Sequence, residues 1–321
     1  MPYKSLLDGI GNTPLVNIHL STPPTVYAKL EYLNPSGSLK DRPALFMIED
    51  AEERGLLKPG DTIVDASSGN YGISLAMIGA LKGYSVVICV PDRTSQEKQL
   101  AIKAYGAELI VCKDTADLND PNGYHTMAEK LHEDISNSFM PNQYANLANG
   151  KAYYQTLGPE LWRQTEGKIT HFIAGAGTCG TLNGTGRYLK EQNSHIKIIG
   201  VDSPHSFRST KGNPQKYNIE GIGVDLESPL LDYSIIDEFI EIPDEDAFSF
   251  VPKLASTGFL VGLSSGAVTS AANTYTKNLK KDDCVVIIFG DSGRAYLTKN
   301  ICTQPKKTNQ LHKHPIKERS L

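Results

Sequence analysis

Short apolar runs alternate with amphipathic stretches along most of this chain. The runs are rich in branched side chains and bounded by turn residues, which predicts buried β-strands. They lie at Val26–Leu30, Thr62–Asp65, Ser85–Val90, Glu108–Cys112, His171–Ala174, Ile196–Val201 and Val285–Phe289. Between several of them apolar positions recur with helical spacing, as at Ile73–Lys82 and Gln96–Tyr105, which predicts helices.

The strand runs are apolar throughout and do not alternate with polar residues. Parallel strands covered by helices on both faces have this character, as Ser85–Val90 and Val285–Phe289 show here. The pattern therefore predicts an α/β fold in which mostly parallel, twisted sheets are flanked by helices. A length of 321 residues suits two such lobes. A polar, Asn-rich stretch at Pro141–Lys151 predicts a crossing between them, and 114–123 predicts a surface excursion.

Composition changes this picture little. A net charge of −4 argues against nucleic acid or an anionic membrane as the main partner. Five cysteines without CxxC spacing predict free thiols, and no metal site is indicated. Neither an apolar leader nor a long apolar span is recognisable, so we expect a cytoplasmic protein. Residues 303–321 are basic and poor in apolar side chains, which predicts a mobile tail.

Lys40 stands out because a turn-forming run precedes it and an apolar helical pattern follows it. The run is Asn34-Pro35-Ser36-Gly37-Ser38-Leu39. The partial positive charge of a helix N-terminus disfavours an ammonium, so this amine is biased towards its neutral, nucleophilic form. A neutral lysine is what an imine with an aldehyde cofactor requires. Taken alone, the segment fits a solvated lysine as well, so other loops must decide.

A glycine-rich turn at Gly175–Gly186 follows the strand His171–Ala174 and leads into a helix. Backbone N–H groups and the helix dipole converge at such a turn, which predicts an anion cradle. The spacing of Gly175, Gly177 and Gly180 also matches the dinucleotide fingerprint, and Asp202 lies near the place of its ribose-binding acid. A nicotinamide-dependent oxidoreductase and a purely structural turn both stay open at this point.

Three further loops have related chemistry. Ser67-Ser68-Gly69-Asn70 follows a predicted strand and predicts a carboxylate site made of backbone amides and hydroxyls. Gly262–Ala267 offers a serine hydroxyl to a ring nitrogen, and Gly290–Arg294 follows the last strand. Each also fits a simple helix cap or turn. Since ligands of open α/β sheets bind at the carboxyl ends of the strands, all these loops can share one crevice.

In this order, the segments resemble the fold-type II pyridoxal-phosphate enzymes, and specifically the cysteine synthase and cystathionine β-synthase family. The resemblance runs from Ile10–Val16 to Asp291–Leu297. It implies a tryptophan synthase β-like fold of two lobes. The N-terminal lobe, with the substrate carboxylate loop, would comprise 1–12 and 36–145. The C-terminal lobe, with the cofactor contacts, would comprise 13–35 and 146–302.

The resemblance also implies a role for each matching residue. Lys40 would hold pyridoxal phosphate as an imine and later move the α-proton of the substrate. Asn70 would contact the ring hydroxyl of the cofactor, and Ser264 would face its pyridine nitrogen. The phosphate would be held by Gly177, Thr178, Cys179, Gly180 and Thr181. The substrate would be bound by Ser67, Ser68, Asn70, Tyr71, Gln143 and, at the cleft mouth, Gly221.

The chain departs from the family pattern at three positions. Ser67 and Tyr71 replace threonines, and Tyr71 is expected to place a phenol beside the substrate and so affect which side chain is accepted. Cys179 replaces a glycine. If that position requires a positive φ, phosphate binding should weaken, because only glycine adopts that conformation without strain.

A serine facing the ring nitrogen does not protonate it, which disfavours transamination and favours loss of a β-leaving group. The resemblance thus implies β-replacement on serine or an O-activated serine through an aminoacrylate. Bacterial cystathionine β-synthases are the closer match at Asp92–Lys98, Asp120–Glu133, Asn142–Asn146 and Asp291–Arg294. Serine plus homocysteine is therefore favoured over O-acetylserine plus sulfide. We expect a homodimer, with a serine acetyltransferase partner only in the cysteine synthase case. An oxidoreductase and a non-catalytic cofactor-binding scaffold are the alternatives.

Overall fold

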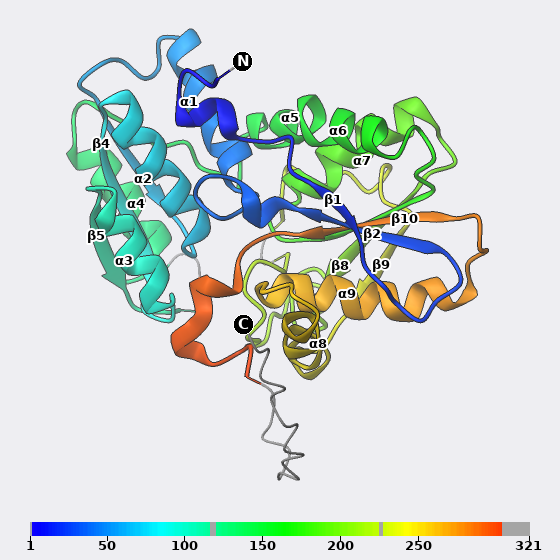
Figure 1. The fold of residues 1–321 in the computed structure, drawn as a ribbon. Helices are drawn as coiled ribbons and strands as arrows, with labels where there is room; N and C mark the ends of the chain where they lie inside the picture. The colour runs from blue at the N-terminus through cyan, green and yellow to red at the C-terminus, as the bar shows by residue number, and fades with distance from the viewer. Residues whose placement is uncertain (1, 116–119, 225–226, 304–321) are drawn as a thin grey trace, which may run out of the picture.

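The protein contains two β-sheets that lie side by side, each with helices on both faces (Figure 1). This computed structural model describes residues 2–115, 120–224 and 227–303. The larger sheet has the strand order β1-β2-β10-β7-β8-β9, and the smaller one has the order β5-β4-β3-β6. All paired strands are parallel except β1 and β2. The predicted α/β fold with mostly parallel sheets is confirmed.

Most strands coincide with the predicted apolar runs. The larger sheet consists of β1 (Leu15–Asn17), β2 (Thr25–Leu30), β7 (His171–Gly175), β8 (Lys197–Asp202), β9 (Glu238–Glu241) and β10 (Cys284–Phe289). The smaller sheet consists of β3 (Thr62–Ala66), β4 (Ser85–Pro91), β5 (Glu108–Cys112) and β6 (Ser138–Phe139). The sequence did not predict β1, β6 or β9. All three are short edge strands, which are buried less completely and so carry a weaker apolar signal.

Helices cover both faces of each sheet. On the larger sheet, one face carries α5 (Ala148–Gln155), α6 (Leu157–Gln164) and α7 (Gly180–Gln192), and the other carries α8 (Asp244–Ser256) and α9 (Leu263–Tyr275) (Figure 1). Around the smaller sheet lie α1 (Asp41–Glu53), α2 (Asn70–Lys82), α3 (Gln96–Ala104) and α4 (Tyr124–Asp134). Short 3-10 helices are η1 (Leu6–Gly9), η2 (Glu31–Leu33), η3 (Thr276–Asn278) and η4 (Gly293–Lys299).

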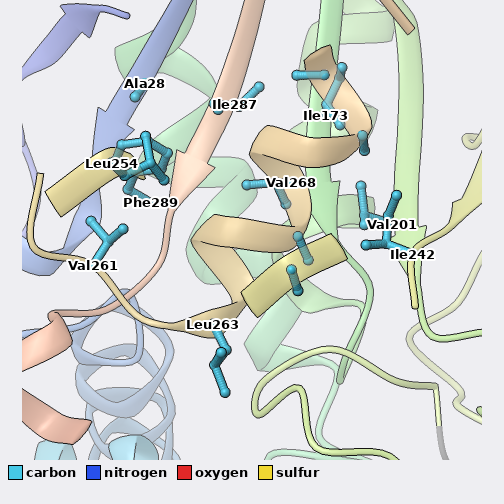
Figure 2. Packing of buried hydrophobic residues seen from close by; sticks show 14 of the residues in the cluster. Ala28, Ile173, Val201, Ile242, Leu254, Val261, Leu263, Val268, Ile287 and Phe289 are labelled. Carbon is cyan, nitrogen blue, oxygen red and sulfur yellow. The ribbon is translucent and has the colours of Figure 1, made fainter. Parts of the chain in front are cut away.

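The central strand β10 shows why its sequence is apolar throughout. Its alternate residues Val285, Ile287 and Phe289 belong to the core under α8 and α9, whereas Val286 and Ile288 belong to the core under α5, α6 and α7. Figure 2 shows the first of these cores, with side chains of α8 and α9 packed among those of the strands. Because both faces of β10 are covered by helices, neither set of side chains can be polar.

The predicted crossing at Pro141–Lys151 leads from β6 of the smaller sheet into α5, which lies on the larger sheet. The boundaries predicted for the two lobes stay a prediction. The predicted surface excursion at 114–123 lies partly outside the described residues, and the predicted basic tail lies outside them except for Thr303. Within the described part of the chain, no helix is long and apolar enough to cross a membrane.

Candidate active site

One pocket lies where β7 and β10 end and where α1, α2 and α9 begin. Among the residues predicted from the sequence, its walls contain Lys40, Asn70, Gly177, Thr178, Cys179, Thr181, Gly221 and Ser264. Segments more than 200 residues apart in the chain thus meet, as expected for loops at the carboxyl ends of parallel strands. The walls also contain Asp291 and Glu220, to which the sequence assigned no role.

Lys40 occupies the N-cap position of α1, at one wall of this pocket. Backbone contacts of the two preceding residues fix its position. The Leu39 N–H donates to the Gly290 carbonyl at 2.8 Å, and Ser38 forms a β-bridge with Asp291. Burial lowers the pKa of Lys40 to about 8, although the Asp291 carboxylate opposes this shift. The amine is therefore neutral in a larger fraction of molecules near neutral pH than an exposed lysine would be.

Two residues after Lys40, Arg42 anchors the start of α1 in a buried ion cluster. Its guanidinium donates to both oxygens of Glu31, at 2.7 and 2.8 Å, and to both oxygens of Glu160, at 2.7 and 2.8 Å. Lys29 donates to the same Glu160 at 2.7 Å. Bidentate pairs of this kind fix geometry as well as charge. The cluster thus ties the helix that presents Lys40 to β2 and α6 of the larger sheet.

The loop 177–181 lies before and within the first turn of α7 and presents backbone amides that fit an anion. No described residue accepts from the backbone N–H groups of Gly177, Thr178 and Cys179. The loop is too crowded for larger residues, since a Cβ on Gly177 would lie 2.9 Å from the Gly221 carbonyl oxygen. A Cβ on Gly180 would lie 2.1 Å from Asn149 Oδ1. Unpaired amides at a helix N-terminus favour a phosphate.

Cys179 is the N-cap of α7 and has a left-handed backbone, with φ at +67°. The position therefore does need the conformation that favours glycine. The thiol is 2% exposed and packs in the core behind the loop, and burial raises its pKa to about 12. It is an uncharged, strained residue behind the cradle.

A pair of variants measures this strain. Cys179→Gly is expected to be more stable than Cys179→Ala by about 1 kcal/mol, since both lack the thiol and only alanine keeps the Cβ that disfavours positive φ. Urea denaturation of both proteins gives the difference. The matched pair Arg187→Gly and Arg187→Ala, at an exposed position inside α7, should show the opposite order, because alanine is favoured within a helix. Greater stability of the alanine variant at 179 would contradict the strain.

The loop 67–71 joins β3 to α2 and differs from prediction in its side chains. The Ser67 hydroxyl accepts from Gly69 N–H at 3.0 Å and Gly72 N–H at 2.9 Å, so it builds the loop and does not face a substrate. The prediction that the Tyr71 phenol lies beside the substrate is also wrong. Tyr71 is 1% exposed and lies in the core against Met47. Packing on α1 turns this side chain away from the pocket.

The backbone of the same loop keeps the predicted character. No described group accepts from the N–H groups of Ser68, Asn70 and Tyr71. Asn70 lies in the pocket wall and donates to Asp291 Oδ2 at 2.7 Å. Gln143 is buried and is not among the residues that line the pocket. Its backbone carbonyl accepts from the Asn149 side chain at 2.7 Å. Its role in carboxylate binding stays a prediction.

Ser264 reaches the pocket from the first turn of α9. Its hydroxyl has no hydrogen bond to any residue in the described ranges. Gly221, with φ at +85°, lies opposite, where an added Cβ would come within 3.8 Å of Ser264 Cβ. The site thus combines an amine of lowered pKa, an amide cradle and a free neutral hydroxyl in one pocket.

The family model described as "Pyridoxal-phosphate dependent enzyme" matches residues 6–291. The chain belongs to this family. The amide cradle suits the phosphate of pyridoxal phosphate and the half-buried amine of Lys40 suits its aldehyde, so the residues present fit the cofactor that members of the family use.

Relatives carry two different activity names. The chain is 42% identical to "Cystathionine beta-synthase" of Apis mellifera, over 92% of this chain and 60% of the relative. It is 41% identical to "Probable cysteine synthase" of Bacillus subtilis, over 92% of this chain and 96% of that protein. A crystal structure of "O-acetylserine dependent cystathionine beta-synthase" from Helicobacter pylori has a TM-score of 0.86 at 37% identity, covering 94% of this chain and 99% of that one. The chain thus spans about three fifths of the honeybee relative.

The nicotinamide alternative is wrong, and Asp202 shows why its motif misleads. The dinucleotide fingerprint needs a free acid for the ribose. The Asp202 carboxylate is instead buried and accepts from Arg208 at 2.6 Å, from Ser206 at 2.8 Å and from the Val224 N–H at 3.2 Å. It holds the segment after β8 in place. The glycine spacing of the loop 175–180 reflects close packing around its backbone.

Proposed function

We propose that this protein catalyses β-replacement on serine or an O-activated serine, with a thiol or sulfide as nucleophile, and that cystathionine from homocysteine is the favoured product. One observation carries the proposal. A lysine amine of lowered pKa shares a pocket with an amide cradle and with a serine hydroxyl that is neutral and unpaired among the described residues. Amine and cradle fit the two ends of pyridoxal phosphate, and the hydroxyl fits its ring nitrogen.

Bound pyridoxal phosphate supplies an electron sink that acidifies the α-hydrogen of an attached amino acid. The protein's own groups then decide the outcome. Backbone N–H groups of Ser68, Asn70 and Tyr71 orient the substrate carboxylate, and the amine of Lys40 takes the α-proton and later returns it. Ser264 offers an uncharged partner to the ring nitrogen. Negative charge that moves onto the ring is therefore stabilised only weakly. Rapid departure of a β-substituent is the outcome that this arrangement favours.

The choice of substrate pair has support on both sides. Honeybee and other relatives are named cystathionine β-synthase, and the Helicobacter pylori structure is titled as an O-acetylserine-dependent form of that enzyme. The full-length match to the Bacillus subtilis protein favours the second candidate, cysteine synthase. Homodimerisation, a cytoplasmic location and a serine acetyltransferase partner stay predictions.

Product analysis separates the candidates. Serine and O-acetylserine are each offered with homocysteine and with sulfide, and products are quantified by mass spectrometry. We expect cystathionine to form with a kcat/KM at least about tenfold above that for cysteine, which corresponds to about 1.4 kcal/mol of transition-state preference. Cysteine as the main product establishes the second candidate. If no donor changes the visible spectrum or yields product, the protein is a cofactor-binding scaffold.

A further inference from the structure

The carboxylate of Asp291 has one oxygen that is fully bonded and one that is free. Asp291 is 3% exposed and lies two residues after the end of β10. Its Oδ2 accepts from Asn70 Nδ2 at 2.7 Å and from the Tyr296 hydroxyl at 2.5 Å. Its Oδ1 is buried and has no hydrogen-bond partner among the described residues. A buried carboxylate oxygen without a partner is costly, so its retention points to a charge or a ligand that it serves.

The backbone places this carboxylate beside Lys40. The two residues before Lys40 pair like a strand with Gly290 and Asp291, through the Ser38–Asp291 bridge and the bond from Leu39 N–H to the Gly290 carbonyl. Both side chains line the same pocket. Asp291 and Cys179 are the groups that favour the charged form of Lys40. Since burial raises the pKa of the Cys179 thiol to about 12, that thiol is neutral and Asp291 supplies the negative charge.

We propose that Asp291 is a positioning residue that pairs with the ammonium form of Lys40 and thereby sets the pH range in which this amine accepts and returns a proton. When Lys40 takes the α-proton, the C–H bond breaks, an N–H bond forms and the bonding electrons stay with the substrate. A positive charge then appears on an amine in the pocket wall. The carboxylate of Asp291, in the same pocket wall, offers that charge a negative partner.

Other polar and charged groups around Asp291 act on the ionisation of its carboxyl group. Burial raises the pKa of Asp291, while Lys98, Tyr296 and Asn70 oppose the shift and Glu220 adds to it. Lys98 donates to the Tyr296 hydroxyl at 2.9 Å and to Glu220 at 2.6 Å. The stem of Lys98 also packs on Gly69, at the turn of the 67–71 loop. Lys299 forms a second pair with Glu220, so positive charge outweighs negative charge around Asp291.

The test measures capture of pyridoxal phosphate by cofactor-free protein, followed by visible absorbance across neutral and alkaline pH. Capture requires the neutral amine, so its pH midpoint reports on Lys40. Asp291→Asn keeps an oxygen for Asn70 and Tyr296 but removes the charge. We expect its midpoint to fall by about one pH unit, and capture at neutral pH to become severalfold faster. Tyr296→Phe is the control, since it removes a hydrogen bond but keeps the carboxylate, and its midpoint should stay at the wild-type value.

The inference rests on the proposed role of Lys40, and the outcomes distinguish the two. Undiminished capture by Lys40→Ala would overturn that role. If wild-type protein captures the cofactor and the Asp291→Asn variant has the same pH midpoint, only the inference about Asp291 is wrong. The same holds if Tyr296→Phe shifts the midpoint as much as Asp291→Asn does. If the asparagine variant unfolds, as circular dichroism would show, Asp291→Ser replaces it, because serine also lacks the charge. Asp291→Glu should keep the midpoint nearer to wild type than either neutral variant.

Discussion

Replacing Lys40 with alanine is expected to abolish the visible absorption band of the cofactor-loaded protein and to lower kcat by about 1,000-fold or more. No second lysine could take its place, because Lys40 is the only lysine among the described residues that line the pocket. Both cofactor retention and movement of the α-proton depend on its amine. Absorbance spectra and steady-state rates of protein purified with added pyridoxal phosphate measure the two effects together.

An exposed lysine serves as the matched control. Lys103 lies on α3 and is exposed, away from the pocket lining. Lys103→Ala should keep both the band and the wild-type rate. A Lys40→Ala protein that is folded and still retains the band would show that another group holds the cofactor, and the proposed role of Lys40 would be wrong.

Replacing Glu160 with alanine is expected to destabilise the protein by about 3–5 kcal/mol. Glu160 contacts both Arg42 and Lys29 in a buried cluster. Its loss leaves two buried cations with too few acceptors, and an unpaired buried charge costs more than the pair itself contributes. Urea denaturation of the cofactor-free protein, followed by far-UV circular dichroism, gives the free energy of unfolding. Weaker cofactor retention should accompany the loss, because Arg42 anchors the helix that presents Lys40.

The control is Glu166→Ala, which removes an exposed pair with Lys168 and should leave the free energy of unfolding unchanged within error.

The pH dependence of the free energy of unfolding gives a second check. Burial raises the pKa of Glu160, but Arg42 and Lys29 outweigh burial and hold it at about 2, below its ordinary value of 4.5. Because the folded-state pKa is depressed, this stabilisation is complete above about 4.5 and is lost as the pH falls towards about 2. A Glu160→Ala deficit that did not narrow in this range would contradict the assignment.

The interior of the fold was readable from the sequence because burial on both faces leaves a continuous apolar run. Strands such as β4, β5 and β10 were predicted to within a residue or two. Edge strands were missed for the converse reason. β9 presents exposed glutamates at both ends, Glu238 and Glu241, and only its middle residues are half-buried. Such a segment looks like a loop until a neighbouring strand is known.

Part of the site was equally readable, because glycine-rich turns after buried strands predict backbone amides whatever the side chains do. Side-chain direction was not readable. Tyr71 lies in the first turn of α2, and only the packing of α2 on α1 decides that its phenol meets Met47. The missed residues Asp291 and Lys98 bind groups about 200 residues distant in the chain, Asn70 and Tyr296 respectively. A buried charge is recognisable only when its distant partner is known. Asp291 did leave one signal, since an acid just beyond the carboxyl end of a buried parallel strand lies at the ligand-binding edge.

The central claim is that the amine of Lys40 holds pyridoxal phosphate. Borohydride reduction of the cofactor-loaded protein makes that link permanent, and peptide mass spectrometry then locates it. The account predicts a phosphopyridoxyl group on the peptide that contains Lys40, with no other lysine labelled above background. A label on a different lysine, or unlabelled Lys40 in protein saturated with the cofactor, would contradict it.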